Sequence, residues 1–180
     1  MKTFGKLAGC LLLGLLLAAM TPAAHAQDAI DGQWEGWDAE WHHTSTQLVA
    51  LAEAMPEKDF AWRPGPGVRS TSEVYMHIVD ANFYLLSVTG IKPPADFKDD
   101  LDKTVTSKAE VIAWLKRSLE AVRQAHVKET PEHLGRKLKI QGRNSTVDWI
   151  YLRILVHGNE HVGQLVAYAR MNGVVPPWSK

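Results

Sequence analysis

The chain has 180 residues, with 20 lysine and arginine side chains against 20 aspartate and glutamate side chains, and a single cysteine. This balanced charge, without a clustered basic face, argues against nucleic-acid binding. The lone Cys10 excludes an intrachain disulfide and a zinc–thiolate cluster, so any metal ion must be held by nitrogen and oxygen ligands.

Residues 1–26 have the pattern of a secretory signal peptide. Lys2 and Lys6 form a short basic region, the run LAGCLLLGLLLAAM is apolar but too short for a bilayer span, and AHA is a small-residue cleavage site. Cys10 also fits a lipoprotein box, but that box precedes most of the apolar run, so lipid anchoring is the less favoured interpretation. We therefore predict a cleaved signal peptide, one mature domain at residues 27–180, and a periplasmic or secreted protein without membrane contact after cleavage.

Two helical segments separated by a loop rich in proline and glycine open the mature chain. Residues 38–55 place tryptophan, leucine and methionine side chains at spacings of three and four, the period of one helix face, and Pro56 ends the segment. Beyond the loop, Ser70 and Glu73 have the spacing of a capping box. The box predicts a second helix at residues 71–90.

Two further helices are predicted in the second half of the chain. Ser107 and Glu110 form another capping-box pattern before an amphipathic segment at residues 109–126. A polar stretch follows, in which KLKIQG could form a short strand or extended chain, and Thr146 then caps a long helix that ends at Gly173. The pattern predicts an all-α protein, a four-helix bundle whose long connections include at least one crossover.

Three histidines lie on apolar faces of two of these helices. His157 and His161 are four residues apart and share a face of the last helix, while His77 lies in line with Val74 and Ala81 on the second. A single histidine on an apolar face is more often a hydrogen-bonded core residue than a ligand. Burying three imidazoles without partners would cost about 1–3 kcal/mol each, whereas one ion satisfies a nitrogen on all three. We predict a divalent metal site, with Zn²⁺ or Ni²⁺ the most suitable ions and open positions for water or substrate.

The chain resembles the DinB-like family (DUF664) of the DinB/YfiT-like superfamily over almost the whole mature part. The resemblance rests on the segment LAEAMPEKDFAWRPGPGVRSTSEVYMHIVDANFY and on HGNEHVGQLVAYARMNGVVPPWS. It implies a four-helix bundle with a divalent metal bound by one histidine of the second helix and two of the fourth, here His77, His157 and His161. Some relatives are thiol-dependent transferases or isomerases that use bacillithiol or mycothiol, a cytosolic setting from which the predicted export of this chain departs.

Glu160 and four further residues are candidates for the surroundings of the metal. HGNEH matches the inverted zincin pattern H-x-x-E-H, in which the glutamate is a general base, although five residues are a weak signal. Glu160 could instead hydrogen-bond a ligand imidazole or face solvent. The residues on or beside the histidine faces that could line a substrate pocket are Trp41, Tyr84, Gln164 and Arg170.

Three classes of function remain open from the sequence. The first is a metal-dependent enzyme, a hydrolase or a thiol-dependent transferase, acting on an unknown small molecule. The second is a non-catalytic metal- or small-ligand-binding module related to stress, and the third is a structural bundle with histidines in its core. Of the adjacent His42 and His43, at most one can point inward, and neither is counted as a primary ligand. Pairing into a homodimer through a helix face is also left open.

Overall fold

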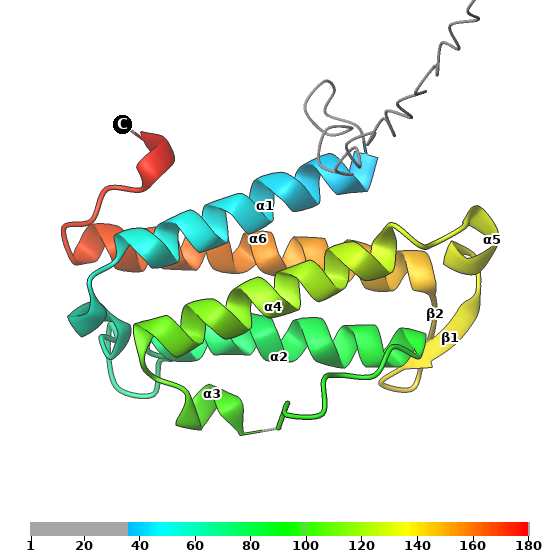
Figure 1. Ribbon diagram of the computed structural model, residues 1–180, viewed down its shortest axis with the longest axis horizontal. Coiled ribbons are helices and arrows are strands. Elements are labelled where there is room, and N and C mark those ends of the chain that lie inside the picture. The colour runs from blue at the N-terminus through cyan, green and yellow to red at the C-terminus, as the bar shows by residue number, and fades with distance from the viewer. Residues whose placement is uncertain (1–35, 99, 180) are drawn as a thin grey trace, which may run out of the picture. The chain divides into compact units, whose positions relative to one another are not determined.

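The computed structural model describes residues 36–98 and 100–179, so the predicted signal peptide and its cleavage site lie outside the described residues. Four long helices dominate this part of the chain (Figure 1). They are α1 (Gly36–Ala54), α2 (Thr71–Thr89), α4 (Lys108–His126) and α6 (Val147–Met171). The prediction of a mostly helical fold with four main helices is confirmed, with only small differences at the helix ends.

A β-hairpin corrects the prediction that the fold is entirely helical. Strands β1 (Lys137–Ile140) and β2 (Arg143–Thr146) pair antiparallel, so the first four residues of KLKIQG do form a strand. The two residues between the strands, Gln141 and Gly142, have φ angles of 49° and 77°. Positive φ at both positions is typical of the tight turn whose twist matches that of the paired strands.

The remaining elements are short; three lie in the long connections between the main helices, and η2 follows α6. They are the 3₁₀ helices η1 (Glu57–Phe60) and η2 (Pro177–Ser179) and the one-turn helices α3 (Leu101–Thr104) and α5 (Pro131–Leu134). None of the helices among the described residues is long and apolar enough to cross a bilayer.

Each main helix packs against two others. Helix α1 contacts α4 and α6, and α2 contacts the same two helices, so α1 and α2 face each other across the core (Figure 1). The connection from α1 to α2 therefore runs diagonally, as the predicted crossover requires. Because α2 and α6 are direct neighbours, the histidine of α2 lies beside the histidine pair of α6.

The start of α2 is held by the predicted capping box. The backbone N–H of Glu73 donates to the Ser70 hydroxyl oxygen (3.3 Å), and the backbone N–H of Ser70 donates to the Glu73 carboxylate (2.6 Å). The box predicted for α4 forms only in part. The Glu110 carboxylate accepts from the Ser107 hydroxyl (2.5 Å), not from the Ser107 backbone N–H that a reciprocal box would use.

Candidate metal centre

Three imidazole rings converge where α2 packs against α6. The Nε2 atom of His157 lies 3.2 Å from Nε2 of His77 and 3.1 Å from Nε2 of His161. One ring nitrogen from each of the three histidines lies within 4.8 Å of the others, which is close enough for them to hold one metal ion. The two helix faces predicted to meet do meet.

The spacing of these nitrogens fits a shared ion. With metal–nitrogen distances of about 2.0–2.1 Å, neighbouring ligands lie about 2.9 Å apart at a right angle and about 3.4 Å apart in a tetrahedron. The two Nε2 separations of 3.2 and 3.1 Å fall between these limits. His157 is therefore spaced from each of the other two histidines as two ligands of one ion would be.

Hydrogen bonding among the rings explains the cluster less well. An uncharged imidazole nitrogen has either one hydrogen or one lone pair. Nε2 of His157 can therefore make one good hydrogen bond, yet two other Nε2 atoms lie within bonding distance of it. A metal ion accepts one lone pair from each ring, so it satisfies all three nitrogens together.

All three histidines are held in the uncharged form that a metal requires. Burial, together with the smaller effect of the nearby positive charge of Arg69, lowers the pKa of His77 to about 4. Burial, followed by the charges of the other two histidines, lowers the pKa of His157 to about 4. Burial also lowers the pKa of His161, although its hydrogen bond to Gln164 opposes that shift. At neutral pH the three lone pairs are therefore available.

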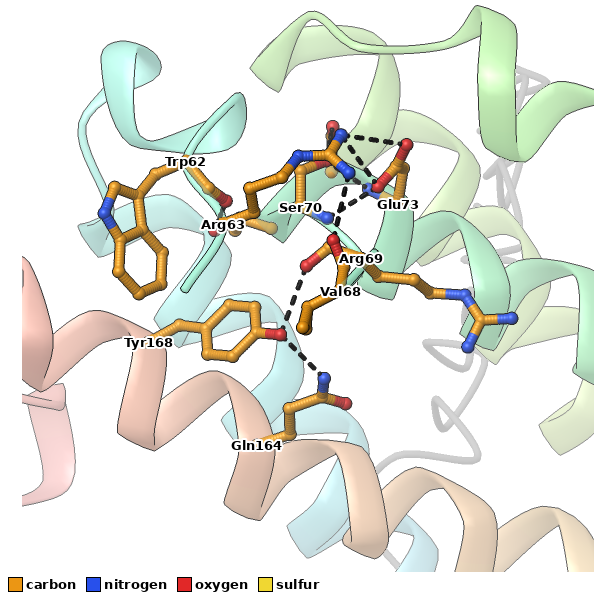
Figure 2. Close-up of polar contacts among 10 residues, drawn as sticks. Trp62, Arg63, Val68, Arg69, Ser70, Glu73, Gln164 and Tyr168 are labelled. Carbon is orange, nitrogen blue, oxygen red and sulfur yellow. Dashed lines mark hydrogen bonds and ion pairs between the residues drawn. The ribbon is translucent and has the colours of Figure 1, made fainter. Parts of the chain in front are cut away.

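A chain of hydrogen bonds orients His161. Nδ1 of His161 donates to the Gln164 side-chain oxygen (2.8 Å), and the Gln164 amide donates to the Tyr168 hydroxyl (2.9 Å), which donates to the backbone carbonyl of Arg69 (3.1 Å). Figure 2 shows the Tyr168 hydroxyl between Gln164 and this carbonyl. Because a carbonyl can only accept, the direction of every bond is set, and Nε2 of His161 keeps its lone pair for a metal.

The loop that supplies the Arg69 carbonyl is itself tied to α2. Arg63 donates to the carbonyl of Val68 (3.0 Å) and forms an ion pair with Glu73 (3.2 Å), as Figure 2 shows. Glu73 also caps α2, the helix that contains His77. The side chain of Arg69 points away from these contacts. The same loop thus supports the ligands on both helices.

Gly158 lies between the two histidines of α6 for a packing reason. A Cβ atom at this position would lie 3.1 Å from the Thr44 side-chain methyl and 3.9 Å from the Trp41 ring, both on α1. A residue larger than glycine would therefore push α1 away from the ligand helix.

Two hollows open beside the histidines. The larger, of about 610 Å³, lies between α2, the hairpin and α6, and His157 forms part of its wall. The smaller, of about 440 Å³, lies between α2 and the segment that follows it, and His77 forms part of its wall. Ala81 and Tyr84 line both hollows. The histidine cluster therefore borders one hollow at His157 and the other at His77.

The predicted pocket residues do not all lie near the histidines. Tyr84 lines the hollows, and Gln164 contacts His161. Trp41, in contrast, is 2% exposed and stacks on Trp37, so its assignment to the pocket is corrected to the core. Arg170 lies exposed in the last turn of α6, about 13 Å along the helix axis from His161, too far to belong to the site.

Glu160 and the histidines of α1 lie outside the cluster. Glu160 is exposed, and its carboxylate accepts two hydrogen bonds from Arg153, which lower its pKa. Its position agrees with a solvent-facing charge, one of the three roles considered from the sequence. His42 and His43 are both exposed on α1.

Sequence reasoning missed several residues at the site. Tyr168 lies on the same helix face as Gln164, so helix periodicity could have indicated their contact. Asp80, which lines the smaller hollow, follows His77 by one turn and could have been found in the same way. Arg143 and Trp149 line the larger hollow, and no pattern in the sequence places the hairpin against α2.

The fold and the site define a helical protein with four main helices and a three-histidine cluster that could hold a metal ion. The sequence model of the DinB superfamily matches residues 40–165. Because this match covers most of the chain, the protein belongs to the DinB superfamily, which confirms the resemblance found from the sequence.

Two solved structures have the same fold. A DinB-like protein from Bacillus cereus ATCC 10987 has a TM-score of 0.67 at 22% identity, over 78% of this chain and 93% of its own. A DinB-like protein from Bacillus subtilis has a TM-score of 0.62 at 16% identity, over 80% of this chain and 97% of its own. No curated protein matches the chain.

Proposed function

We propose that this protein is a divalent-metal-dependent enzyme acting on a small molecule, with His77, His157 and His161 as the metal ligands. The observation that carries the proposal is the convergence of three Nε2 atoms beside two hollows. Three protein ligands leave coordination positions open, which is typical of catalytic sites. Zn²⁺ and Ni²⁺ suit a site built from imidazole nitrogens.

Hydrolysis and thiol-dependent transfer are the two reactions that suit this site. When bound, a divalent ion acts as a Lewis acid and lowers the pKa of a coordinated water or thiol. The two hollows on either side of Tyr84 favour transfer, because they offer separate places for a thiol and its acceptor. Tyr84 would position the bound molecules. Gln164 would orient the ligand His161.

A non-catalytic metal- or ligand-binding module is the second candidate. The ion pair between Glu160 and Arg153 favours such a module, because a general base must be free to accept a proton. For either function, the pattern of residues 1–26 supports export to the periplasm or the medium. Glu160 would act as a base only after leaving Arg153.

Metal analysis tests the proposed site. The purified protein should bind about one equivalent of Zn²⁺ or Ni²⁺, measured by mass spectrometry after dialysis, and His157→Ala should lose it. His42→Ala, which removes an exposed histidine from α1, is the matched control and should bind normally. Full metal retention by His157→Ala would falsify the ligand assignment.

Turnover assays separate the two candidates. The metal-loaded protein would be tested with esters, amides and pairs of a thiol and an electrophile. Rates well above those of His77→Ala support an enzyme. Rates equal to those of the variant across all three groups favour the binding module.

A further inference from the structure

The larger hollow has positive charge and no acidic side chain in its wall. Arg143 from the hairpin and Arg153 from α6 line it together with His157, and its other lining residues are uncharged. A divalent ion at the histidines would add further positive charge at the His157 end. The wall therefore favours an anionic molecule.

The two arginines differ in whether their charge is already neutralised. The guanidinium of Arg153 makes two hydrogen bonds, of 3.1 and 2.5 Å, with the Glu160 carboxylate. Within the described part of the chain, the guanidinium of Arg143 has no hydrogen-bond or ion-pair partner. Arg143 directly follows the tight turn at Gln141 and Gly142, so the hairpin holds its backbone in place.

Two exposed aromatic rings line the same hollow. Tyr84 on α2 is 48% exposed and Trp149 on α6 is 42% exposed, and both contribute to the wall. Large aromatic side chains left this open beside a cation suit a ligand that has a flat apolar body and a charged end. The volume of about 610 Å³ is sufficient for such a molecule.

We propose that this hollow binds a small organic carboxylate with a flat apolar body. The carboxylate pairs with Arg143, whose planar guanidinium matches its two oxygens. The body packs against Tyr84 and Trp149, and the reacting end of the molecule faces His157. This inference rests on the proposed function, because it names the substrate class of that metal site.

Calorimetric titration of the zinc-loaded protein with benzoate and its uncharged analogue benzamide tests the proposal. Benzoate should bind at least tenfold more tightly than benzamide. Equal binding of the two would overturn the proposal, and tighter binding of phenyl phosphate than of benzoate would overturn the choice of a carboxylate.

The variant Arg143→Gln tests the assigned partner. It should weaken benzoate binding at least fivefold and leave benzamide binding and zinc content unchanged. Lys139→Gln, which removes an exposed charge from the same hairpin outside the hollow, is the control and should behave like the wild type. An unchanged benzoate affinity in Arg143→Gln would overturn the assignment.

Titration of the metal-free protein separates this inference from the metal site. The preference for benzoate should persist there, because Arg143 is present without the ion. If the protein does not bind zinc but still prefers benzoate to benzamide, the result contradicts the proposed function alone. Normal zinc binding without any preference would contradict this inference alone.

Discussion

The hydroxyl group of Tyr168 donates a 3.1 Å hydrogen bond to the backbone carbonyl of Arg69, 99 residues earlier in the chain. This bond joins the end of α6 to the loop before α2, and it leaves the Tyr168 oxygen as an acceptor for Gln164. It thereby determines which nitrogen of His161 holds the hydrogen.

Tyr168→Phe should weaken zinc binding by about tenfold, because the amide of Gln164 is then free to turn and His161 loses its fixed orientation. Competition titration with a chelator measures the change. Tyr75→Phe is the control, because the buried Tyr75 hydroxyl has no hydrogen-bond partner among the described residues. Equal zinc affinity in the two variants would show that the hydrogen-bonded chain does not support the ligand. Nitrogen-15 NMR of the metal-free protein should also show mixed His161 tautomers only in Tyr168→Phe.

Two glycines of α6 should respond to alanine in opposite directions. Gly163→Ala should stabilise the fold by about 0.5–1 kcal/mol, since a Cβ atom there meets open space and alanine favours the helix. Gly158→Ala should lower the free energy of unfolding by roughly 1 kcal/mol. Overpacking against Thr44 costs more there than the higher helix propensity of alanine contributes. Urea unfolding of the metal-free proteins measures both changes.

The variant Thr44→Ser supplies a check on the cause. It removes the methyl group that a Cβ atom at residue 158 would meet. Gly158→Ala should therefore be less destabilising in the Thr44→Ser protein. If Gly158→Ala destabilises the Thr44→Ser protein as much as the wild type, the loss of stability does not come from the contact with the Thr44 methyl group.

The metal-free protein should lose stability as the pH falls from about 6.5 towards 4. The unfolded chain has ordinary histidine pKa values near 6.5, whereas His77 and His157 have pKa values of about 4 in the folded state. Between these values the unfolded chain binds protons that the folded chain does not, so acid favours unfolding. Unfolding curves at several pH values measure the slope, which His77→Gln should reduce and His42→Ala should not. A slope that does not change in His77→Gln would contradict the pKa assignment.

Glu160→Gln should strengthen the binding of carboxylates. Removal of the Glu160 charge frees the guanidinium of Arg153, so that the larger hollow then has two unpaired cations. Benzoate titration should show an affinity gain of a fewfold, with zinc content unchanged. If the variant instead loses all turnover on a substrate that still binds, Glu160 is a general base and its ion pair with Arg153 opens during the reaction.

The parts of the structure that helix periodicity and capping govern could be predicted from the sequence. Ser70 and Thr146 cap the helices that contain the histidines, and the faces containing His77 and His157 were expected to meet because one ion could then satisfy a nitrogen on all three histidines. Periodicity cannot tell whether an aromatic residue on such a face lines a pocket or fills the core. Only the structure shows that Trp41 lies in the core, where α1 packs against Gly158 of α6.

Longer-range relationships were harder to predict for two physical reasons. The strands of the hairpin have four residues each, too few for alternation to be recognised or for its packing against α2 to be inferred. The contact between Tyr168 and Arg69 depends on the path of a loop rich in proline and glycine. The partner of Glu160, in contrast, is two helical turns earlier, and helix geometry alone could have suggested Arg153.

Thr146 is both the last residue of β2 and the N-cap of α6. The strand that forms one wall of the larger hollow therefore continues, without a linker, into the helix that contains two of the three histidines. A substitution at Arg143 would therefore alter the wall of the hollow and leave the spacing of His157 and His161 on α6 unchanged.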